Sequence, residues 1–152
     1  MNSGSARFSN GKLRKRIGIA FTVAGFLIFL LGAEPDLFGL DRSPVTGLVQ
    51  IFVFLIGLAF MCIGGYISIA SLWNNYPKSI VADIGLRLVS TGYVIAVGSG
   101  MADVFGFGSH PIPRLAIFGI WQEIGVLIGE IVIAAGFLLM IPYRLPSSSG
   151  QA

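Results

Sequence analysis

The stretch that decides the fold is LAIFGIWQEIGVLIGEIVIAAGFLLMI, from Leu115 to Ile141, which is apolar over the length of a membrane crossing. A helix needs about 20 predominantly apolar residues to cross the hydrocarbon core of a bilayer. Within this stretch the charged residues are Glu123 and Glu130. A carboxylate in hydrocarbon is costly and usually faces a bundle interior or a water-filled cavity. The stretch therefore predicts a membrane helix that carries a candidate site.

Helical periodicity places the two acids on one face of this helix. Glu130 follows Glu123 by seven residues, which returns the side chain to within about 20° of the same direction. Gly125 and Gly129 are four apart on a nearby strip, a spacing that lets two membrane helices approach closely. Two explanations for the acids stay open: structural groups bonded to a neighbouring helix or protonated, or parts of a transport or ligand-binding site.

The composition predicts an all-α integral membrane protein with one domain. Of 152 residues, 55% are hydrophobic and 11% are charged, whereas soluble domains have roughly 25% charged residues. Long, continuous apolar runs favour helices over an outer-membrane barrel, whose strands alternate apolar and polar residues. We expect a multi-pass protein of a prokaryotic plasma membrane.

Four spans are expected, at about residues 17–33, 45–73, 80–101 and 115–141. They divide the chain into a basic segment (1–16), a first transmembrane hairpin (17–73), a second hairpin that carries the buried charges (80–141) and a flexible tail (142–152). The first span is expected to end at Glu34-Pro35-Asp36, because two acids and a proline do not fit in hydrocarbon.

The distribution of basic residues predicts that both termini are cytoplasmic. Basic residues concentrate in cytoplasmic segments of membrane proteins. With four spans, seven basic residues fall on the cytoplasmic side: Arg7, Lys12, Arg14, Lys15, Arg16, Lys78 and Arg144. Arg42 and Arg114 fall on the opposite side, and Arg87 falls within the third span.

The sequence contains an internal repeat, which predicts two tandem-duplicated helical hairpins. At an offset of 67 residues, Gly18, Gly25, Asp36 and Gly39 align with Gly85, Gly92, Asp103 and Gly106. At an offset of 72 residues, Gln50, Gly57 and Gly64 align with Gln122, Gly129 and Gly136. Each copy holds two spans and so enters the membrane from the same side, as in a parallel repeat.

Glycine positions within the spans predict close packing between helices. The expected packing glycines are Gly18, Gly25, Gly57, Gly64, Gly85, Gly92, Gly125, Gly129 and Gly136.

The two copies differ in charge, which defines a candidate intramembrane site. The first copy has Ala20, Ile51 and Leu58 where the second has Arg87, Glu123 and Glu130. Asp83 and Arg87 are four residues apart and therefore adjacent on one helix face. We expect Arg87 to pair with Glu130 on the neighbouring helix, with Asp83 supporting Arg87, because a buried charge needs a partner. The candidate site is thus Asp83, Arg87, Glu123 and Glu130.

These features favour an accessory or structural membrane subunit, or a self-associating helical bundle. The alternative is a proton- or ion-coupled transporter protomer that uses Glu123 and Glu130. The expected partners are membrane lipid and either a larger membrane complex or further copies of the chain, and not nucleic acid. We expect no enzyme activity and no cofactor, because the sequence contains no nucleophile with a base and no cofactor motif. We expect no metal, because His110 has no cluster of ligands around it and Cys62 is the single cysteine.

Overall fold

The computed structural model describes residues 3–39, 47–73, 77–106 and 119–142, and this part of the chain is helical, without strands. The elements are α1 (Ser3–Ala33), the short 3₁₀ helix η1 (Pro35–Phe38), α2 (Leu48–Leu72), α3 (Ile80–Gly100) and α4 (Ile120–Met140). Four helices are long and apolar enough to cross a membrane. The predicted all-α class with four candidate spans is confirmed. Asp41, Arg42, His110, Arg114, Arg144 and the tail after residue 142 lie outside the described residues.

Two helices begin at positions that differ from those predicted. Helix α1 starts at Ser3, so the basic segment is helical and continuous with the first span. Helix α4 starts at Ile120, where the Gln122 side-chain oxygen accepts a hydrogen bond from the Gly119 N–H at 2.7 Å. This bond satisfies a donor that the first helical turn leaves free. Glu123 therefore lies in the first turn of α4, near one end of the bundle.

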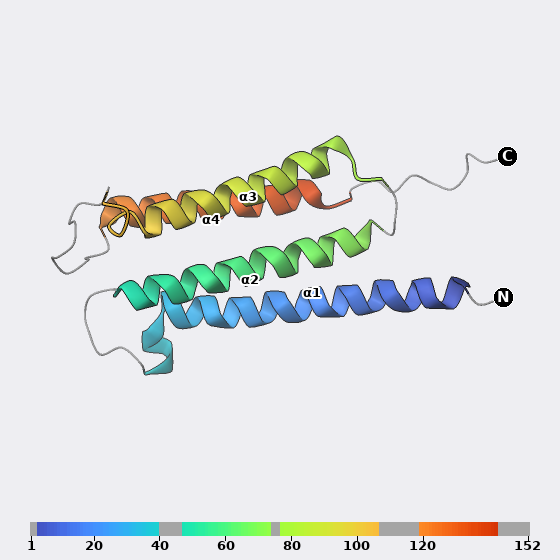
Figure 1. The fold of residues 1–152 in the computed structure, drawn as a ribbon, viewed down its shortest axis with the longest axis horizontal. Helices are drawn as coiled ribbons and strands as arrows, with labels where there is room; N and C mark the ends of the chain where they lie inside the picture. Colours follow the sequence, from blue (N-terminus) through green and yellow to red (C-terminus); the bar gives the residue numbers. More distant parts are fainter. Residues whose placement is uncertain (1–2, 40–46, 74–76, 107–118, 143–152) are drawn as a thin grey trace.

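The helices form two antiparallel hairpins, α1 with α2 and α3 with α4, and α2 lies between α1 and the second hairpin (Figure 1). The loop end of the bundle is defined here as the end where α1 and α3 finish and α2 and α4 begin. The terminal end is the opposite one, where α1 and α3 begin and α2 and α4 finish. The described ends Ser3 and Pro142 both lie at the terminal end (Figure 1).

Within each hairpin, glycines pack against glycines at two levels. A Cβ atom placed on Gly25 would lie 2.8 Å from the Gly57 carbonyl oxygen, and one on Gly18 would lie 2.9 Å from that of Gly64. In the second hairpin, a Cβ on Gly92 would meet the Gly129 oxygen at 2.6 Å, and one on Gly85 would meet the Gly136 oxygen at 2.6 Å. These distances are shorter than real Cβ contacts. The seven-residue spacing along each helix is that of left-handed helix packing.

A third level of packing differs between the hairpins. Gly32 of α1 lies against the backbone of Phe54, whereas Gly125 of α4 lies against the side chain of Ser99. Ser99 follows Gly32 by 67 residues and so occupies the corresponding position. The sequence prediction omitted Gly32 and Ser99, although both continue the seven-residue spacing on their helices.

Matching turns follow α1 and α3 at the loop end. The Gly39 N–H donates to the Asp36 carbonyl oxygen at 3.0 Å, and the Gly106 N–H donates to that of Asp103 at 3.2 Å. Both glycines have a positive φ, 65° and 79°, a conformation that other residues rarely adopt. The two Asp-x-Phe-Gly segments thus form the same kind of turn.

The two hairpins meet through α2, which contacts both α3 and α4. The interface is apolar and includes Leu55, Leu58, Val89 and Phe137. Hydrogen bonds cross it as well: Trp73 Nε1 donates to the Met140 carbonyl oxygen at 3.0 Å, and the Tyr93 hydroxyl donates to that of Leu55 at 3.4 Å. Lys78 Nζ, just before α3, donates to the Tyr66 hydroxyl at 3.0 Å. Within the described residues, α1 packs on α2 and not on α3 or α4. The bundle is therefore open on the side between α1 and α4.

Candidate functional site

A cavity of about 450 Å³ lies on this open side, and both glutamates of α4 line it. We call it the acidic groove; its lining residues are Phe29, Gly32, Ala33, Phe54, Glu123, Val126, Leu127 and Glu130. They belong to α1, α2 and α4. The volume is within the range of roughly 300–1,000 Å³ that is typical of ligand pockets.

The two glutamates lie at different depths in the acidic groove. Glu130 is ten residues from each end of α4, or about 15 Å at 1.5 Å per residue, so it is at the middle of the span. Glu123 is in the first turn, where the partial positive charge of a helix N-terminus favours a carboxylate. Glu123 therefore has a local structural explanation, whereas Glu130 does not.

The wall opposite α4 is aromatic and apolar. The rings of Phe29 and Phe54 meet edge to face, with centroids 6.1 Å apart and an interplanar angle of 84°. Phe54 is buried in the apolar core, which fixes the position of this wall. The acidic groove thus places carboxylates on one side and two aromatic rings on the other.

The described residues provide no cationic partner for either glutamate in the acidic groove. Glu130 is half-buried and Glu123 is exposed, and the ion pair formed within the described part of the chain joins two residues of α3. A carboxylate at the middle of an apolar helix is unfavourable unless it gains a proton or a positively charged group. The acidic groove is therefore suited to hold a cation.

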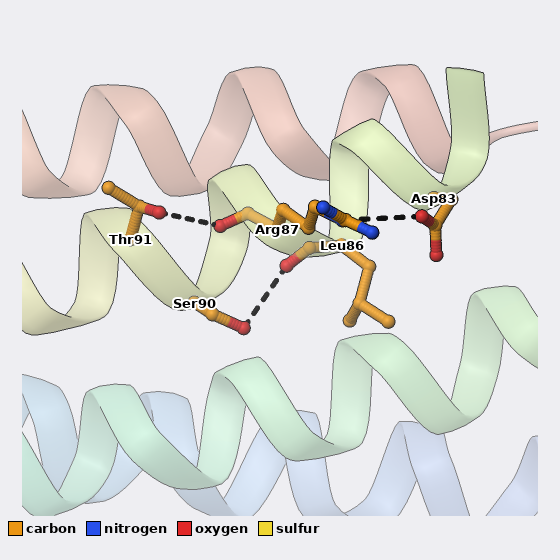
Figure 2. A network of polar contacts seen from close by, with 5 residues as sticks. All are labelled: Asp83, Leu86, Arg87, Ser90 and Thr91. Carbon is orange, nitrogen blue, oxygen red and sulfur yellow. Dashed lines mark hydrogen bonds and ion pairs between the residues drawn. The ribbon is translucent and has the colours of Figure 1, made fainter. Parts of the chain in front are cut away.

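The expected pair between Arg87 and Glu130 is wrong. Arg87 Nε lies 3.3 Å from Asp83 Oδ2, and the two side chains are 81% and 57% exposed on the outside of α3 (Figure 2). The face of α3 that packs on α4 contains Gly85, and Arg87 is turned by about 200° from that residue around the helix axis. The pairing of Asp83 with Arg87 agrees with their spacing in the sequence. The charged residues of the second hairpin therefore form two separate features.

Hydroxyl groups near Arg87 are satisfied by their own helix. Ser90 Oγ donates to the Leu86 carbonyl oxygen at 3.1 Å, and Thr91 Oγ1 donates to that of Arg87 at 2.8 Å (Figure 2). Leu86 points towards α2, whereas Asp83 and Arg87 lie on the outside of α3 (Figure 2). These hydroxyls do not need a partner from outside the helix.

Two buried polar side chains at the loop end were flagged in the sequence only as repeat matches. Asp103 and Gln122 are 6% and 7% exposed, and Asp103 Oδ1 and Gln122 Nε2 have no hydrogen-bond partner among the described residues. Gln122 fixes the start of α4 through Gly119, and this start determines where Glu123 enters the acidic groove. Gln122 therefore acts as a positioning residue for the site.

Comparisons with protein-family models, curated proteins and solved structures gave no match to this chain. The fold defines a small four-helix bundle with the composition of a multi-pass membrane protein. The described residues contain no group of three or more His, Cys, Asp or Glu that could hold a metal ion.

Proposed function

We propose that this protein is a transporter protomer that binds a small organic cation in the acidic groove, with Glu130 as the residue that holds the positive charge. One observation carries the proposal: Glu130, at the middle of a membrane-spanning helix, lines an open cavity and has no cation beside it among the described residues. Ionisable residues placed in this way commonly mark substrate or ion pathways.

The lining of the acidic groove supports a cation with apolar substituents. Phe29 and Phe54 offer aromatic rings, and a cation close to an aromatic ring is attracted by its quadrupole. Leu127 and Val126 add apolar surface. A strongly hydrated inorganic cation would instead need several oxygen ligands. An amine or quaternary ammonium group on an apolar body fits this combination better.

A proton can be exchanged for the solute at Glu130. A protonated carboxyl group suits the empty groove in an apolar setting, and arrival of the cation favours the carboxylate with release of one proton. Departure of the cation reverses the step. Glu123, about 10 Å further along α4 at 1.5 Å per residue, supplies a second negative charge towards the loop end.

We infer that the terminal end faces the cytoplasm of a prokaryotic cell, because the basic residues of α1 lie there. We further infer that the two hairpins arose by duplication. The support is that Gly25–Gly57 and Gly18–Gly64 correspond in position to Gly92–Gly129 and Gly85–Gly136. The matching turns after α1 and α3 give independent support.

A second candidate function, as an accessory subunit in a larger membrane assembly, is favoured by a different observation. Asp83 and Arg87 are exposed on a helix that is long and apolar enough to span a membrane. A charged pair in this place is costly against lipid and favours a protein neighbour. The two functions are compatible, since the acidic groove and this pair are on different parts of the bundle.

Binding of tetraphenylphosphonium to the purified protein in detergent tests the transporter proposal. We expect the wild-type chain to bind this apolar cation and the Glu130→Gln variant to bind it at least tenfold more weakly. Glu34→Gln is the matched control, because Glu34 is an exposed acid that does not line the acidic groove. Equal binding by all three proteins, or no binding by the wild type, would overturn the proposal.

A further inference from the structure

We infer that the outside of α3 is the contact surface between two copies of this chain. The surface is a stripe of residues at spacings of three and four, which repeat along one side of a helix. We call it the α3 stripe; its members are Ile80, Asp83, Arg87, Thr91, Val94 and Gly98, and all are exposed. This inference does not depend on the acidic groove, which is formed by α1, α2 and α4.

The ion pair on the α3 stripe leaves most of the guanidinium group unused. The contact joins one nitrogen of Arg87, Nε, to one oxygen of Asp83, Oδ2. A guanidinium group has five N–H donors, and a carboxylate has two oxygens that accept several bonds. In a single copy, the remaining donors of Arg87, about 10 Å from the start of α3 at 1.5 Å per residue, have no partner among the described residues. A second carboxylate would satisfy them.

Lipid phosphate is a less suitable partner for Arg87. The residue is about 10 Å from the start of α3 at 1.5 Å per residue, so its side chain would have to extend towards the terminal end to reach a headgroup. Asp83 occupies that direction, one helical turn closer to the terminal end. Its carboxylate repels an anionic headgroup and attracts a cationic side chain.

The α3 stripe is complementary to itself. The basic residues of α1 favour one orientation for every copy, and a twofold axis that relates two copies of the same orientation lies along the membrane normal. The two α3 helices then run parallel with equal residues at equal depth, so the other copy's Asp83 lies four residues, or about 6 Å, nearer the terminal end than Arg87. The Arg87 side chain already extends in that direction to its own Asp83, which brings the Asp83 of the other copy within its reach. Two such pairs form together, and four charges neutralise one another.

Gly98 provides an independent indication that a neighbour packs on the α3 stripe. A Cβ placed on Gly98 would meet nothing within 4 Å, whereas Gly85, Gly92 and Gly100 of the same helix each contact other helices of the bundle. Gly98 therefore has no packing role within the described part of one copy. Small residues on the outside of a membrane helix allow a second helix to approach closely.

The corresponding stripe on α1 has the composition expected for lipid contact. The residues 67 positions before the α3 stripe are Leu13, Arg16, Ala20, Ala24, Leu27 and Leu31. Apart from Arg16, which belongs to the basic segment, they are apolar. Leu27 is 55% exposed, against 68% for Val94. The α1 stripe therefore serves as a matched control on the same fold.

Cysteine cross-linking in native membranes tests the inference with the native charges in place. In a chain with Cys62→Ala, we expect oxidation to link Val94→Cys into a disulfide dimer. The control Leu27→Cys, at the matching position of α1, should give at least fivefold less dimer. Equal dimer yields at the two positions, or no dimer from Val94→Cys, would overturn the inference.

Charge reversal separates contact between copies from binding of lipid. The D83R variant has two arginines on the α3 stripe, and the R87D variant has two aspartates. We expect each variant alone to give at least fivefold less dimer in the Val94→Cys assay, and coexpression of the two to restore it. If Arg87 instead bound lipid phosphate, the dimer yield of D83R would equal or exceed that of the Val94→Cys chain with native charges. Coexpression with R87D would then not raise the yield. That result would contradict the inference, as would full dimer formation by both single variants.

Discussion

The two hairpins have the same glycine packing between their helices but differ in the residues at matching positions on other faces of α2 and α4. Gly25 meets Gly57 in the first hairpin as Gly92 meets Gly129 in the second. In the first hairpin, Ile51 and Leu58 are 3% and 4% exposed and belong to the apolar core. The residues 72 positions later are Glu123 and Glu130, which line the acidic groove.

The difference shows how one packing pattern can give two environments. Helix α2 is covered by α1 on one side and by α3 and α4 on another, whereas α4 packs on α3 and only partly on α2. A carboxylate at position 58 would be enclosed by apolar side chains, which is costly. At position 130 it opens on a cavity. The location of α2 between the other helices thus explains why the acids occur in only one hairpin.

The largest expected effect comes from exchanging the residue types at these two positions. Leu58→Glu should destabilise the protein by about 3–5 kcal/mol, because it buries an unpaired charge in the core. Glu130→Leu should leave stability unchanged or raise it, because it places an apolar group in an apolar span. Unfolding by SDS titration measures both. Similar losses in the two variants would show that Glu130 is enclosed as Leu58 is.

The next largest effect tests the shared packing of the hairpins. Gly25→Leu and Gly92→Leu should each cost about 3 kcal/mol, because the added atoms meet the backbone of the neighbouring helix and cannot be accommodated by side-chain movement. Gly11→Leu is the control, since a Cβ there meets no described residue within 4 Å. The same titration is suitable. A large loss of stability in one of the two glycine variants and none in the other would show that the hairpins are not packed in the same way.

Much of this arrangement could be predicted from the sequence, because it depends on local composition and spacing. The four apolar runs and the glycines seven residues apart on α1 and α3 are examples. The direction of Arg87 could not be predicted by matching depths along two helices, since depth says nothing about rotation around the helix axis. Gly85 and Gly92, which face α4, contained the missing information, because a residue two positions after Gly85 points away from that face.

The smallest expected effect concerns the coupling between the two charged features. Arg87→Leu and Glu130→Leu should change the free energy of unfolding additively, within about 0.5 kcal/mol, because residues without shared contacts do not couple. A double-mutant cycle in detergent measures this. Arg87→Leu with Asp83→Leu is the comparison, and this pair should couple because the two side chains are in contact. Strong recovery of stability by Glu130→Leu in the Arg87→Leu background would instead show that Arg87 and Glu130 are paired.

Carbodiimide modification of Glu130 in intact membranes, followed by mass spectrometry, tests the central claim most directly. The claim is that Glu130 opens on the acidic groove and is independent of Arg87. We predict that Glu130 is modified in the wild-type chain, at the same rate in the Arg87→Leu variant, and more slowly when tetraphenylphosphonium is present. A Glu130 that is unreactive in the wild type and becomes reactive only after Arg87→Leu would contradict the claim.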